Sequence, residues 1–377
     1  MKLDIPVPLD ENATFPLDLD SDLLDTPAVV VDLDVIEANI ARMADYARLS
    51  GVALRPHIKT HKSPQMARRQ LENGASGVCV AKVSEAEVMV EAGITDVTVA
   101  YPILGVAKLV RLAPLLTRAR FILVADSPET LAGYETMASA LGTAIDVLVE
   151  VDTGMHRIGV NPERVVELAR LVRDHRHLVF AGILTHAGHA HNAADAEGIK
   201  YVAREEARIL GALREDLEAA GFEVRVVTAG STLTAPFLTS ADGITEIRPG
   251  TYIYNDLRTV ACWSATRDQI AASAVVSVVS ADHERVTVDA GNKTLTLTRE
   301  EAYGFGQVAD RPEILVTRLS EEHGVLTSPS YRPVVGERLR ILPIHVCVWM
   351  DLQAEVYGVR GGKIVERIFL PAMRHSL

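Results

Sequence analysis

The feature that most constrains this fold is a rhythm of short β-rich runs and longer amphipathic segments between about residues 50 and 250. Helical apolar spacing occurs at 83–92, 107–116, 162–173 and 196–220. The β-rich runs between them lie at 52–54, 77–80, 96–100, 121–124, 146–151, 180–184, 224–227 and 245–247. Alternation of this kind is typical of parallel βαβ units. So many strands in about 200 residues favour a closed TIM-type (β/α)8 barrel over an open doubly wound sheet.

The pattern changes after residue 255. Short, partly alternating runs separated by turn residues appear at 274–279, 285–288, 294–297, 338–342 and 364–368. They predict a second, mostly antiparallel β domain. The early run 28–33 is a further strand candidate, which we expect to pair outside the barrel, with the β domain. The expected organisation of this α/β chain is therefore an N-terminal segment 1–25, a barrel 26–255 and a β domain 256–377.

Composition excludes several classes of protein. The formal net charge is −12, which argues against a nucleic-acid-binding surface. The longest apolar runs fall well short of the roughly eighteen residues of a membrane span, and residues 1–25 are acidic rather than signal-like. The three cysteines, Cys79, Cys262 and Cys347, are irregularly spaced, unlike a disulfide framework. We therefore expect a cytoplasmic protein with neither a nucleic-acid nor a membrane partner.

A dense group of basic residues, 55–62, follows the first barrel strand with the sequence RPHIKTHK. Catalytic groups of a (β/α)8 barrel lie at the C-terminal ends of its strands, where this group falls. A desolvated lysine loses its proton and can condense with an aldehyde, so Lys59 is a candidate nucleophile. A solvated basic loop is the alternative.

Three further segments follow later strands. The histidine-rich stretch 185–191 (THAGHAH) suggests a cofactor face or a metal, with surface histidines as the alternative. Two loops, 229–232 (AGST) and 248–252 (RPGTY), follow the seventh and eighth strands. Small residues and hydroxyls suit a phosphate, and these loops are the usual phosphate-binding place in this fold.

A His-x-Cys triplet lies near the C-terminus. His345 and Cys347 occur in a β-like run, where alternation would place both side chains on one face. An imidazole and a thiolate suit a borderline-soft ion such as zinc, and two ligands would leave the ion open to substrate. A buried cysteine beside a chance histidine is the more common explanation of such a triplet.

Taken together, these motifs resemble one family. The stretches 55–62, 83–87 (VSEAE) and 152–159 (DTGMHRIG) look like those of fold-type III pyridoxal-phosphate (PLP) enzymes. The chain is most similar to the D-threonine aldolase and D-serine dehydratase family, a relative of alanine racemase. The resemblance extends from Asp25 to the C-terminus with the motifs in the family's order.

The resemblance implies roles for matching positions. Lys59 matches the Schiff-base lysine, His186 the residue lying against the pyridine ring, and Arg157 the arginine of the racemase G-M-x-R-x-G motif. Arg248 matches the arginine facing the pyridine nitrogen in the racemases, a position that is often not arginine in the aldolase and dehydratase branch. The positions that match phosphate-binding residues, or lie beside them, are Gly230, Ser231, Thr232, Gly250, Thr251 and Tyr252.

The resemblance also implies an activity. His345 and Cys347 match the lyases' metal pair (zinc or manganese), which the racemases lack, so a lyase acting on a small β-hydroxy D-amino acid is expected. Two details favour D-serine dehydration to pyruvate and ammonia: the H-x-C form of the pair and the THAGH stretch. The alternative is aldol cleavage of D-threonine to glycine and acetaldehyde, with His61 and His189 as candidate bases.

Other readings remain open. A racemase would need a tyrosine such as Tyr303, and a non-catalytic PLP-binding protein would lack the second domain. Family members pair head to tail, which implies a homodimer.

Overall fold

The computed structural model describes residues 15–282, 285–327 and 333–373. The chain divides into two compact units. One, the barrel unit, comprises Ile40–Tyr252 with Cys262–Ser264. The other, the β unit, comprises the described parts of 1–39 and 265–374 together with Ile253–Ala261.

The barrel unit is built on a sheet of parallel strands in the order β3-β10-β9-β8-β7-β6-β5-β4. Backbone hydrogen bonds from Ser76 N to Leu54 O and from Cys79 N to Pro56 O, both 2.8 Å, join its two ends. The sheet is therefore closed, and the predicted (β/α)8 barrel is confirmed. Its strands are β3 Ala53–Leu54, β4 Val78–Val80, β5 Asp96–Pro102, β6 Arg120–Ala125, β7 Ile145–Glu150, β8 Leu178–Leu184, β9 Val226–Ala229 and β10 Glu246–Ile247.

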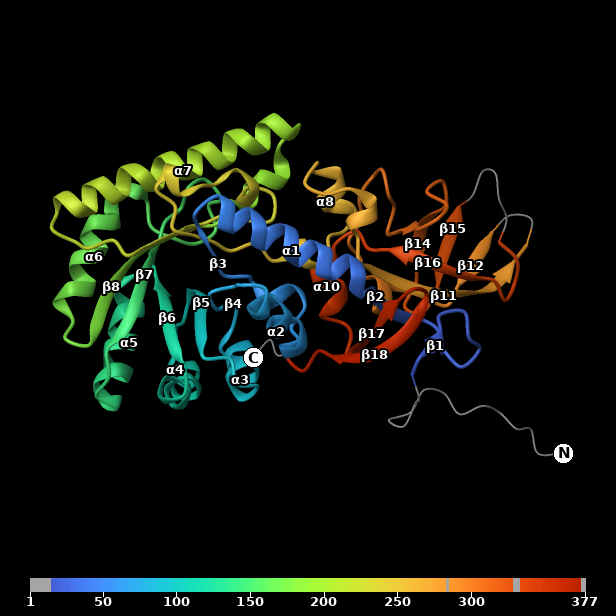
Figure 1. Cartoon of the computed structure of the whole chain (residues 1–377), viewed down its shortest axis with the longest axis horizontal. Coiled ribbons are helices and arrows are strands. Elements are labelled where there is room, and N and C mark those ends of the chain that lie inside the picture. Colours follow the sequence, from blue (N-terminus) through green and yellow to red (C-terminus); the bar gives the residue numbers. More distant parts are fainter. Residues whose placement is uncertain (1–14, 283–284, 328–332, 374–377) are drawn as a thin grey trace. The chain divides into compact units, whose positions relative to one another are not determined.

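Helices lie outside these strands (Figure 1). Their apolar faces pack on the outward-facing strand residues to form the largest apolar core of the protein. Gly142 ends one of them in the left-handed conformation, with φ 61°. The helices are α2 Pro64–Glu72, α3 Val83–Glu91, α4 Val106–Leu112, α5 Pro128–Leu141, α6 Val165–Asp174 and α7 Ala196–Ala219, and α1 Leu33–Leu49 crosses the division between the units.

The inward-facing residues of the barrel form layers. A charged layer occupies the N-terminal ends of the strands, where Arg55 pairs with Glu246 at 2.7 Å and with Asp96 at 2.5 Å. An apolar layer lies further along the strands and contains Ile122, Val124, Leu148, Ala181 and Leu184. Because side chains alternate along a strand, Glu150 continues the inward row of Leu148. The C-terminal end of the barrel interior therefore begins at Glu150.

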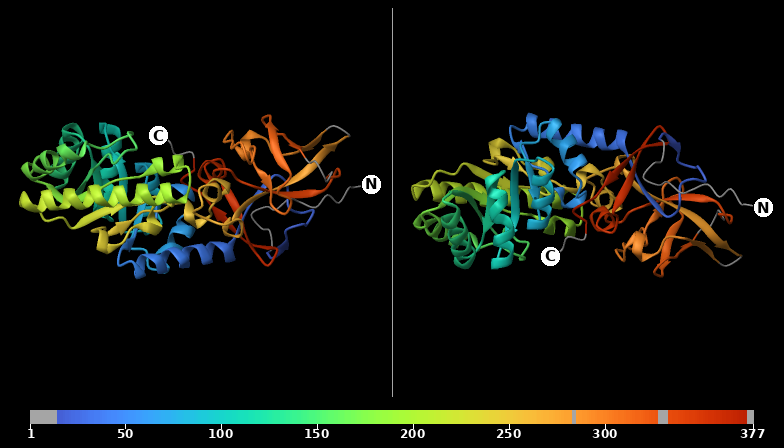
Figure 2. Two further views of the ribbon diagram at one scale, coloured as in Figure 1. Left: turned by 90° about the horizontal axis from the view of Figure 1, so that it is seen from above. Right: turned by 90° about the horizontal axis from the view of Figure 1, so that it is seen from below.

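The β unit contains a mostly antiparallel sheet, seen from two further sides in Figure 2. Strand β2 pairs with β11 and β17 in this sheet. The strands are β1 Leu17–Asp18, β2 Ala28–Asp32, β11 Ala272–Ala281, β12 Val286–Val288, β13 Gln307–Val308, β14 Leu315–Leu319, β15 Gly324–Thr327, β16 Arg338–Leu342, β17 Glu355–Arg360 and β18 Lys363–Phe369, and the helices are α8 Leu257–Ala261, α9 Asn292–Leu295 and α10 Val346–Met350.

Two predicted strands in this unit are wrong. Residues 294–297 fall in and just after helix α9, where the backbone N–H of Leu295 bonds the carbonyl of Gly291 at 2.8 Å. The run around 345–347 is the start of helix α10, with His345 as its N-cap. β-branched and aromatic residues favoured a strand in both places, but tertiary packing overrides such weak preferences in short segments.

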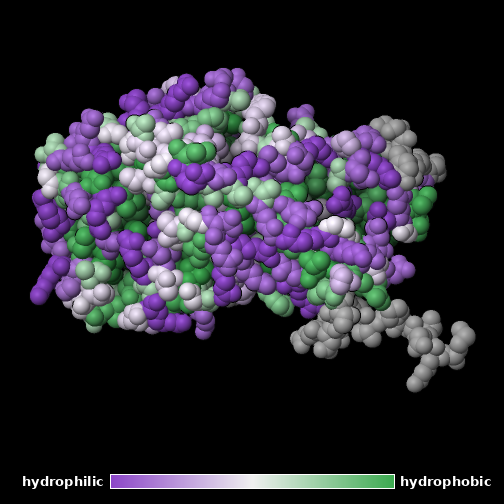
Figure 3. Space-filling model, in the orientation of Figure 1, coloured by the Kyte–Doolittle hydropathy of each residue, from purple (hydrophilic) through white to green (hydrophobic). Residues whose placement is uncertain are grey.

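Polar and apolar side chains are interspersed on the surface shown in Figure 3. None of the helices in the described ranges has the length and apolar character that a membrane span requires.

Candidate active site

Lys59 lies in a short 3-10 turn, Ile58–Thr60, immediately after β3. His57 precedes this turn as its N-cap, and its Nδ1 accepts a 3.4 Å hydrogen bond from the Lys59 backbone N–H. Both residues therefore lie at the C-terminal end of the barrel, the end at which (β/α)8 enzymes carry their catalytic groups.

Two buried imidazoles, those of His57 and His186, lie close enough to Lys59 for its charge to affect their pKa values. Burial lowers the pKa of His57 well below its ordinary value, and the charges of Lys59 and Arg248 lower it further. Burial also lowers the pKa of His186 well below its ordinary value, and the charges of Lys59, Arg248 and Arg157 lower it further. The structure thus brings the predicted Lys59, His186, Arg157 and Arg248 together, with both imidazoles neutral at pH 7.

Other residues of the 55–62 stretch serve the fold. Arg55 belongs to the charged layer described above. Lys62 pairs with buried Glu85 at 2.9 Å, and the other oxygen of Glu85 accepts a 2.6 Å hydrogen bond from Ala81 N, which lies just before α3. The family motif 83–87 therefore anchors this loop.

His61 is fully buried in a hydrogen-bond network. Its Nδ1 accepts from Ser63 N at 3.1 Å, so Nε2 carries the proton and donates to Gln70 Oε1 at 3.1 Å. Gln70 Nε2 in turn donates to the Tyr252 hydroxyl at 2.9 Å. Burial lowers the pKa of His61 to about 4. Because both ring nitrogens are engaged, this network leaves neither for a substrate proton.

His189 differs from His61. It lies in a 3-10 turn, Gly188–Asn192, and its Nδ1 is buried without a hydrogen-bond partner in the described part of the chain. A Cβ built on Gly154 would lie 3.5 Å from its ring, which places His189 against the 152–159 loop that carries Arg157. Burial lowers its pKa, so a neutral imidazole with an available acceptor is present here.

The two loops predicted to bind phosphate meet in the barrel unit. Thr232 Oγ1 accepts a 3.2 Å hydrogen bond from Tyr252 N, which leaves its hydroxyl proton to donate elsewhere. Gly250 passes so close to the 57–60 turn that a Cβ would lie 2.9 Å from His57 O and 3.0 Å from Thr60 Oγ1. Only glycine allows this approach, so the residues present fit a phosphate held against the turn that carries Lys59.

Not every predicted phosphate donor is available. The Gly230 amide donates to Glu206 Oε1 at 3.1 Å, and the Ser231 amide donates to Thr234 Oγ1 at 2.9 Å. The Tyr252 hydroxyl is fully buried against Gln70, and burial raises its pKa above the usual value. Of the predicted groups, the hydroxyl of Thr232 and the Gly250–Thr251 segment are the best placed to contact the anion.

Arg248 is held rigidly inside the barrel. Its Nε donates to Thr228 Oγ1 at 3.0 Å, and one terminal nitrogen donates to the carbonyl of Thr185. A guanidinium has N–H donors and no acceptor, so it would face a pyridine nitrogen as a hydrogen-bond donor and keep that nitrogen unprotonated.

Sequence reasoning missed two buried carboxyl groups at this end of the barrel. Glu150 and Glu206 are 3 % and 1 % exposed. Burial raises the pKa of each to about 7, although Arg248 lowers both. In each, Oε2 has no hydrogen-bond partner among the described residues. Their signal in the sequence was a glutamate at an inward strand position and one on the apolar face of a helix.

The predicted metal pair lies in the β unit. His345 caps α10 with an extended backbone, and Cys347 stands in its first turn, partly exposed. The backbone N–H of Val346 donates to Asp256 Oδ2 at 3.0 Å. Burial raises the pKa of that carboxyl, and the nearby His345 acts in the opposite direction. Strand alternation therefore does not orient the pair. Imidazole and thiolate still suit zinc as donors, but no set of three or more metal-binding side chains occurs in the described ranges.

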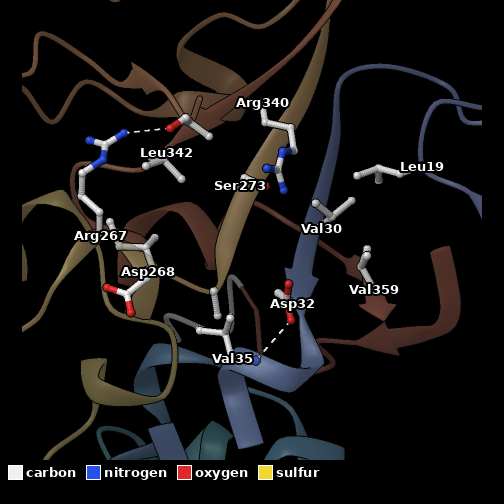
Figure 4. A pocket seen from close by; sticks show the side chains of 13 residues that line it. Leu19, Val30, Asp32, Val35, Arg267, Asp268, Ser273, Arg340, Leu342 and Val359 are labelled. Carbon is white, nitrogen blue, oxygen red and sulfur yellow. Dashed lines mark hydrogen bonds between the residues drawn. The ribbon is translucent and has the colours of Figure 1, made fainter. Parts of the chain in front are cut away.

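The β unit also contains a cavity of about 310 Å³ (Figure 4). Arg267 and Arg340 line it together with Asp32 and Asp268. Asp32 caps α1 by accepting from Val35 N at 3.1 Å, and Arg267 donates to Ala309 O at 3.0 Å. Lining charges of both signs thus serve the fold, and the predicted site residues are not among them.

Comparison with known proteins identifies the family of this chain. Residues 31–257 match the model of the alanine racemase N-terminal domain, and residues 271–359 match a putative serine dehydratase domain. The chain belongs to the alanine racemase N-terminal domain family. The prediction of a fold-type III lyase in the D-threonine aldolase and D-serine dehydratase family is confirmed.

Relatives cover nearly the whole chain. D-threonine aldolase of Arthrobacter sp. is 35 % identical over 92 % of each chain. D-threo-3-hydroxyaspartate dehydratase of Delftia sp. (strain HT23) is 34 % identical over 86 % of this chain and 91 % of its own. The solved D-threonine aldolase from Filomicrobium marinum has a TM-score of 0.90 and 33 % identity over 97 % of this chain and 100 % of its own. A cysteine variant of D-threo-3-hydroxyaspartate dehydratase, solved in the metal-free form, has a TM-score of 0.87 and 31 % identity over 94 % and 98 %.

Proposed function

We propose that this chain is a PLP- and divalent-metal-dependent lyase for a small β-hydroxy D-amino acid, and that dehydration of the D-serine type is its favoured reaction. The observation that carries the proposal is the convergence of Lys59, His57, His186 and Arg248 at the C-terminal end of the barrel. The named relatives act on D-threonine and D-threo-3-hydroxyaspartate, both of which carry a β-hydroxyl.

Each residue of the cluster would have a distinct task. Bound PLP supplies an electron-accepting ring conjugated to the substrate amine. Lys59 would hold the cofactor aldehyde, and its amine would accept the α-proton of the substrate. Neutral His186 would pack against the ring, while Arg157 and Arg248 would bind its polar edge. The hydroxyl of Thr232 and the backbone of Gly250 and Thr251 would hold the phosphate, and the turn at Gly230 and Ser231 would shape its cradle.

His345 and Cys347 would hold the metal. A zinc or manganese ion there supplies Lewis-acid assistance to departure of the β-hydroxyl. A cysteine variant of the related dehydratase is described in a metal-free form, which supports a metal role for a cysteine in this family. The putative serine dehydratase domain model spans the same segment here and favours elimination.

Aldol cleavage is the second candidate, because the Arthrobacter relative is a D-threonine aldolase. That route needs a base for the hydroxyl proton. His189, with its unpartnered Nδ1, is the base that the geometry favours over His61.

The test is to load the protein with PLP and zinc or manganese and supply D-serine, D-threonine and D-threo-3-hydroxyaspartate in turn. Pyruvate or oxaloacetate with ammonia would establish elimination. Acetaldehyde or glyoxylate with glycine would establish the aldol route instead. Racemisation of D-serine without either product would refute a lyase.

We further propose that residues 26–255 act as the PLP-binding domain and 256–377 as the metal-bearing domain of a cytoplasmic homodimer. Cys79, Cys262 and Cys347 all lie in the described ranges and none of them forms a disulfide there, which suits a reducing compartment. Light scattering on the purified protein would measure the oligomeric state, and a monomeric active enzyme would refute the dimer.

A further inference from the structure

Glu206 is an unusual residue on the buried face of α7. The other buried positions of this helix hold Ile199, Ala203, Ala207, Leu210, Leu213 and Leu217. Glu206 is as buried as they are, at 1 % exposure. Removing a carboxyl from water is costly unless the group makes compensating contacts, so its place in this row calls for a reason.

The reason lies in the loop that follows β9. Glu206 Oε1 accepts a 3.1 Å hydrogen bond from the backbone N–H of Gly230. Gly230 has φ +86°, and a Cβ there would approach both Ala235 and the Leu238 side chain to 3.2 Å. Gly230 is therefore held in one orientation, with Glu206 on its amide and the 235–238 segment packed against its Cα.

The rest of the loop builds on this anchor. Ser231 N donates to Thr234 Oγ1 at 2.9 Å, and Ala235 N donates to Ser231 O at 2.9 Å. These bonds close a tight turn that starts at Gly230 and presents Thr232, which accepts from Tyr252 N in the neighbouring phosphate loop. The direction of Gly230 thus sets where the Thr232 hydroxyl points.

A second loop lies near the same carboxyl. The Ala187 backbone N–H and the Thr234 hydroxyl are close enough to Glu206 to lower its pKa, against the larger opposing effect of burial. Ala187 follows His186, the residue expected against the cofactor ring. One carboxyl group therefore contacts or approaches the two loops that carry the expected ring and phosphate contacts.

We infer that Glu206 is a positioning residue of the cofactor site, which orients the phosphate cradle by accepting the Gly230 amide. This inference rests on the proposed PLP function. Glu206 acts through Gly230, whose backbone N–H donates a 3.1 Å hydrogen bond to its Oε1.

The test compares three variants of the full-length protein. Glu206→Gln keeps an acceptor for Gly230, whereas Glu206→Met has a similar size but no strong acceptor. Glu205→Gln is the matched control, since Glu205 neighbours Glu206 on α7 but pairs with Arg208 at 2.9 Å on the surface. Affinities for PLP and for pyridoxal, which lacks the phosphate, are measured with each protein, together with the visible circular dichroism of bound PLP.

Loss of the acceptor leaves the Gly230 amide unpaired, so Glu206→Met should bind PLP about tenfold or more weakly. Its affinity for pyridoxal should change less than about threefold, because the 3.1 Å hydrogen bond that is lost orients the phosphate cradle, which pyridoxal does not use. Glu206→Gln and the control should keep wild-type PLP affinity and dichroism. The ratio of the two affinities is insensitive to a uniform loss of stability. If Glu206→Met does not fold, Glu206→Asp, whose shorter side chain withdraws the acceptor from Gly230, should show the same selective loss.

Equal PLP affinity and dichroism in Glu206→Met and wild type would overturn the inference. So would an equal loss for both ligands, or a loss in Glu206→Gln as large as in Glu206→Met. Failure of the wild-type protein to bind PLP at all would instead refute the proposed function, and the two failures are therefore distinguishable.

Discussion

The proposed cofactor site at the C-terminal end of the barrel and the proposed metal pair, His345 and Cys347, differ in how their residues are brought together. At the barrel end, side chains from residue 57 to residue 252 meet because eight parallel strands end at one rim. In the β unit, the two candidate ligands are separated by one residue at the start of one short helix. The first site depends on the whole barrel, and the second on a local sequence with a supporting carboxyl, Asp256.

The difference follows from the ligands. An organic cofactor has a ring, an aldehyde and a phosphate several ångströms apart, so its contacts must come from several loops. A metal ion is a point, and two donors within three residues can hold it while leaving positions for substrate. A substitution in one proposed site should therefore leave ligand binding at the other unchanged.

The largest effect is expected from Lys59→Ala. The variant should lose the visible absorption band of lysine-bound cofactor and more than about 100-fold of lyase activity, because in the proposed function one amine would both hold the cofactor and accept the α-proton. Absorption spectra and product assays measure both. Lys108→Ala on α4, whose Nζ lies 5.8 Å from the Tyr101 ring centroid, is the control. A variant that retained the band would remove Lys59 from the site.

Cys347→Ala should separate the two regions. Loss of a metal contact in the outer shell typically costs about 10- to 100-fold, so loss of a direct ligand should cost at least that in activity. The cofactor spectrum should stay unchanged and the metal content should fall. Val348→Ala, the next residue on α10 and 39 % exposed, is the matched control. Full activity after exhaustive chelation would refute metal dependence.

Glu150→Gln should change how stability depends on pH. Burial raises the pKa of Glu150 to about 7 from an ordinary value of 4.5, so the folded state binds this proton more tightly than the unfolded chain. The contribution of this proton to the free energy of unfolding is present in full below about pH 4.5 and is lost as the pH rises through 7. Linkage sets it on the order of 3 kcal/mol.

Urea unfolding of the cofactor-free protein between pH 5 and 8 measures this dependence. Wild type should lose stability over that range, and Glu150→Gln should lose less. Glu163→Gln, an exposed residue of the barrel unit, should follow wild type. Parallel curves for all three proteins would show that Glu150 does not carry the shifted proton.

The smallest effect on catalysis is expected from His61→Ala. Because both ring nitrogens are occupied within the protein, the variant should lose about 2–4 kcal/mol of unfolding free energy through a cavity and unpaired partners. Its turnover at saturating cofactor should fall less than about threefold. In the same assays, His189→Ala should lose more aldol turnover than His61→Ala and less unfolding free energy. The reverse ranking would make His61 the base.

Local patterns were enough to predict much of this protein. Each predicted barrel strand overlaps an observed one because buried parallel strands are β-rich runs with helices between them. Lys59, His186 and Arg248 could be located because each follows a strand at the catalytic rim. Motif resemblance then identified the family, which the comparisons confirm.

Tertiary structure decided what each side chain is available to do. Arg55, Lys62 and His61 belong to one basic stretch, yet partners remote in sequence, such as Glu246 and Glu85, engage two of them and a buried network engages the third. Residues 346–350 form a helix where a strand was predicted, because tertiary packing outweighs the weak β-propensity of a short segment. Glu150 and Glu206 became visible only as buried carboxyls, because burial, which raises their pKa values, is set by residues far away along the chain.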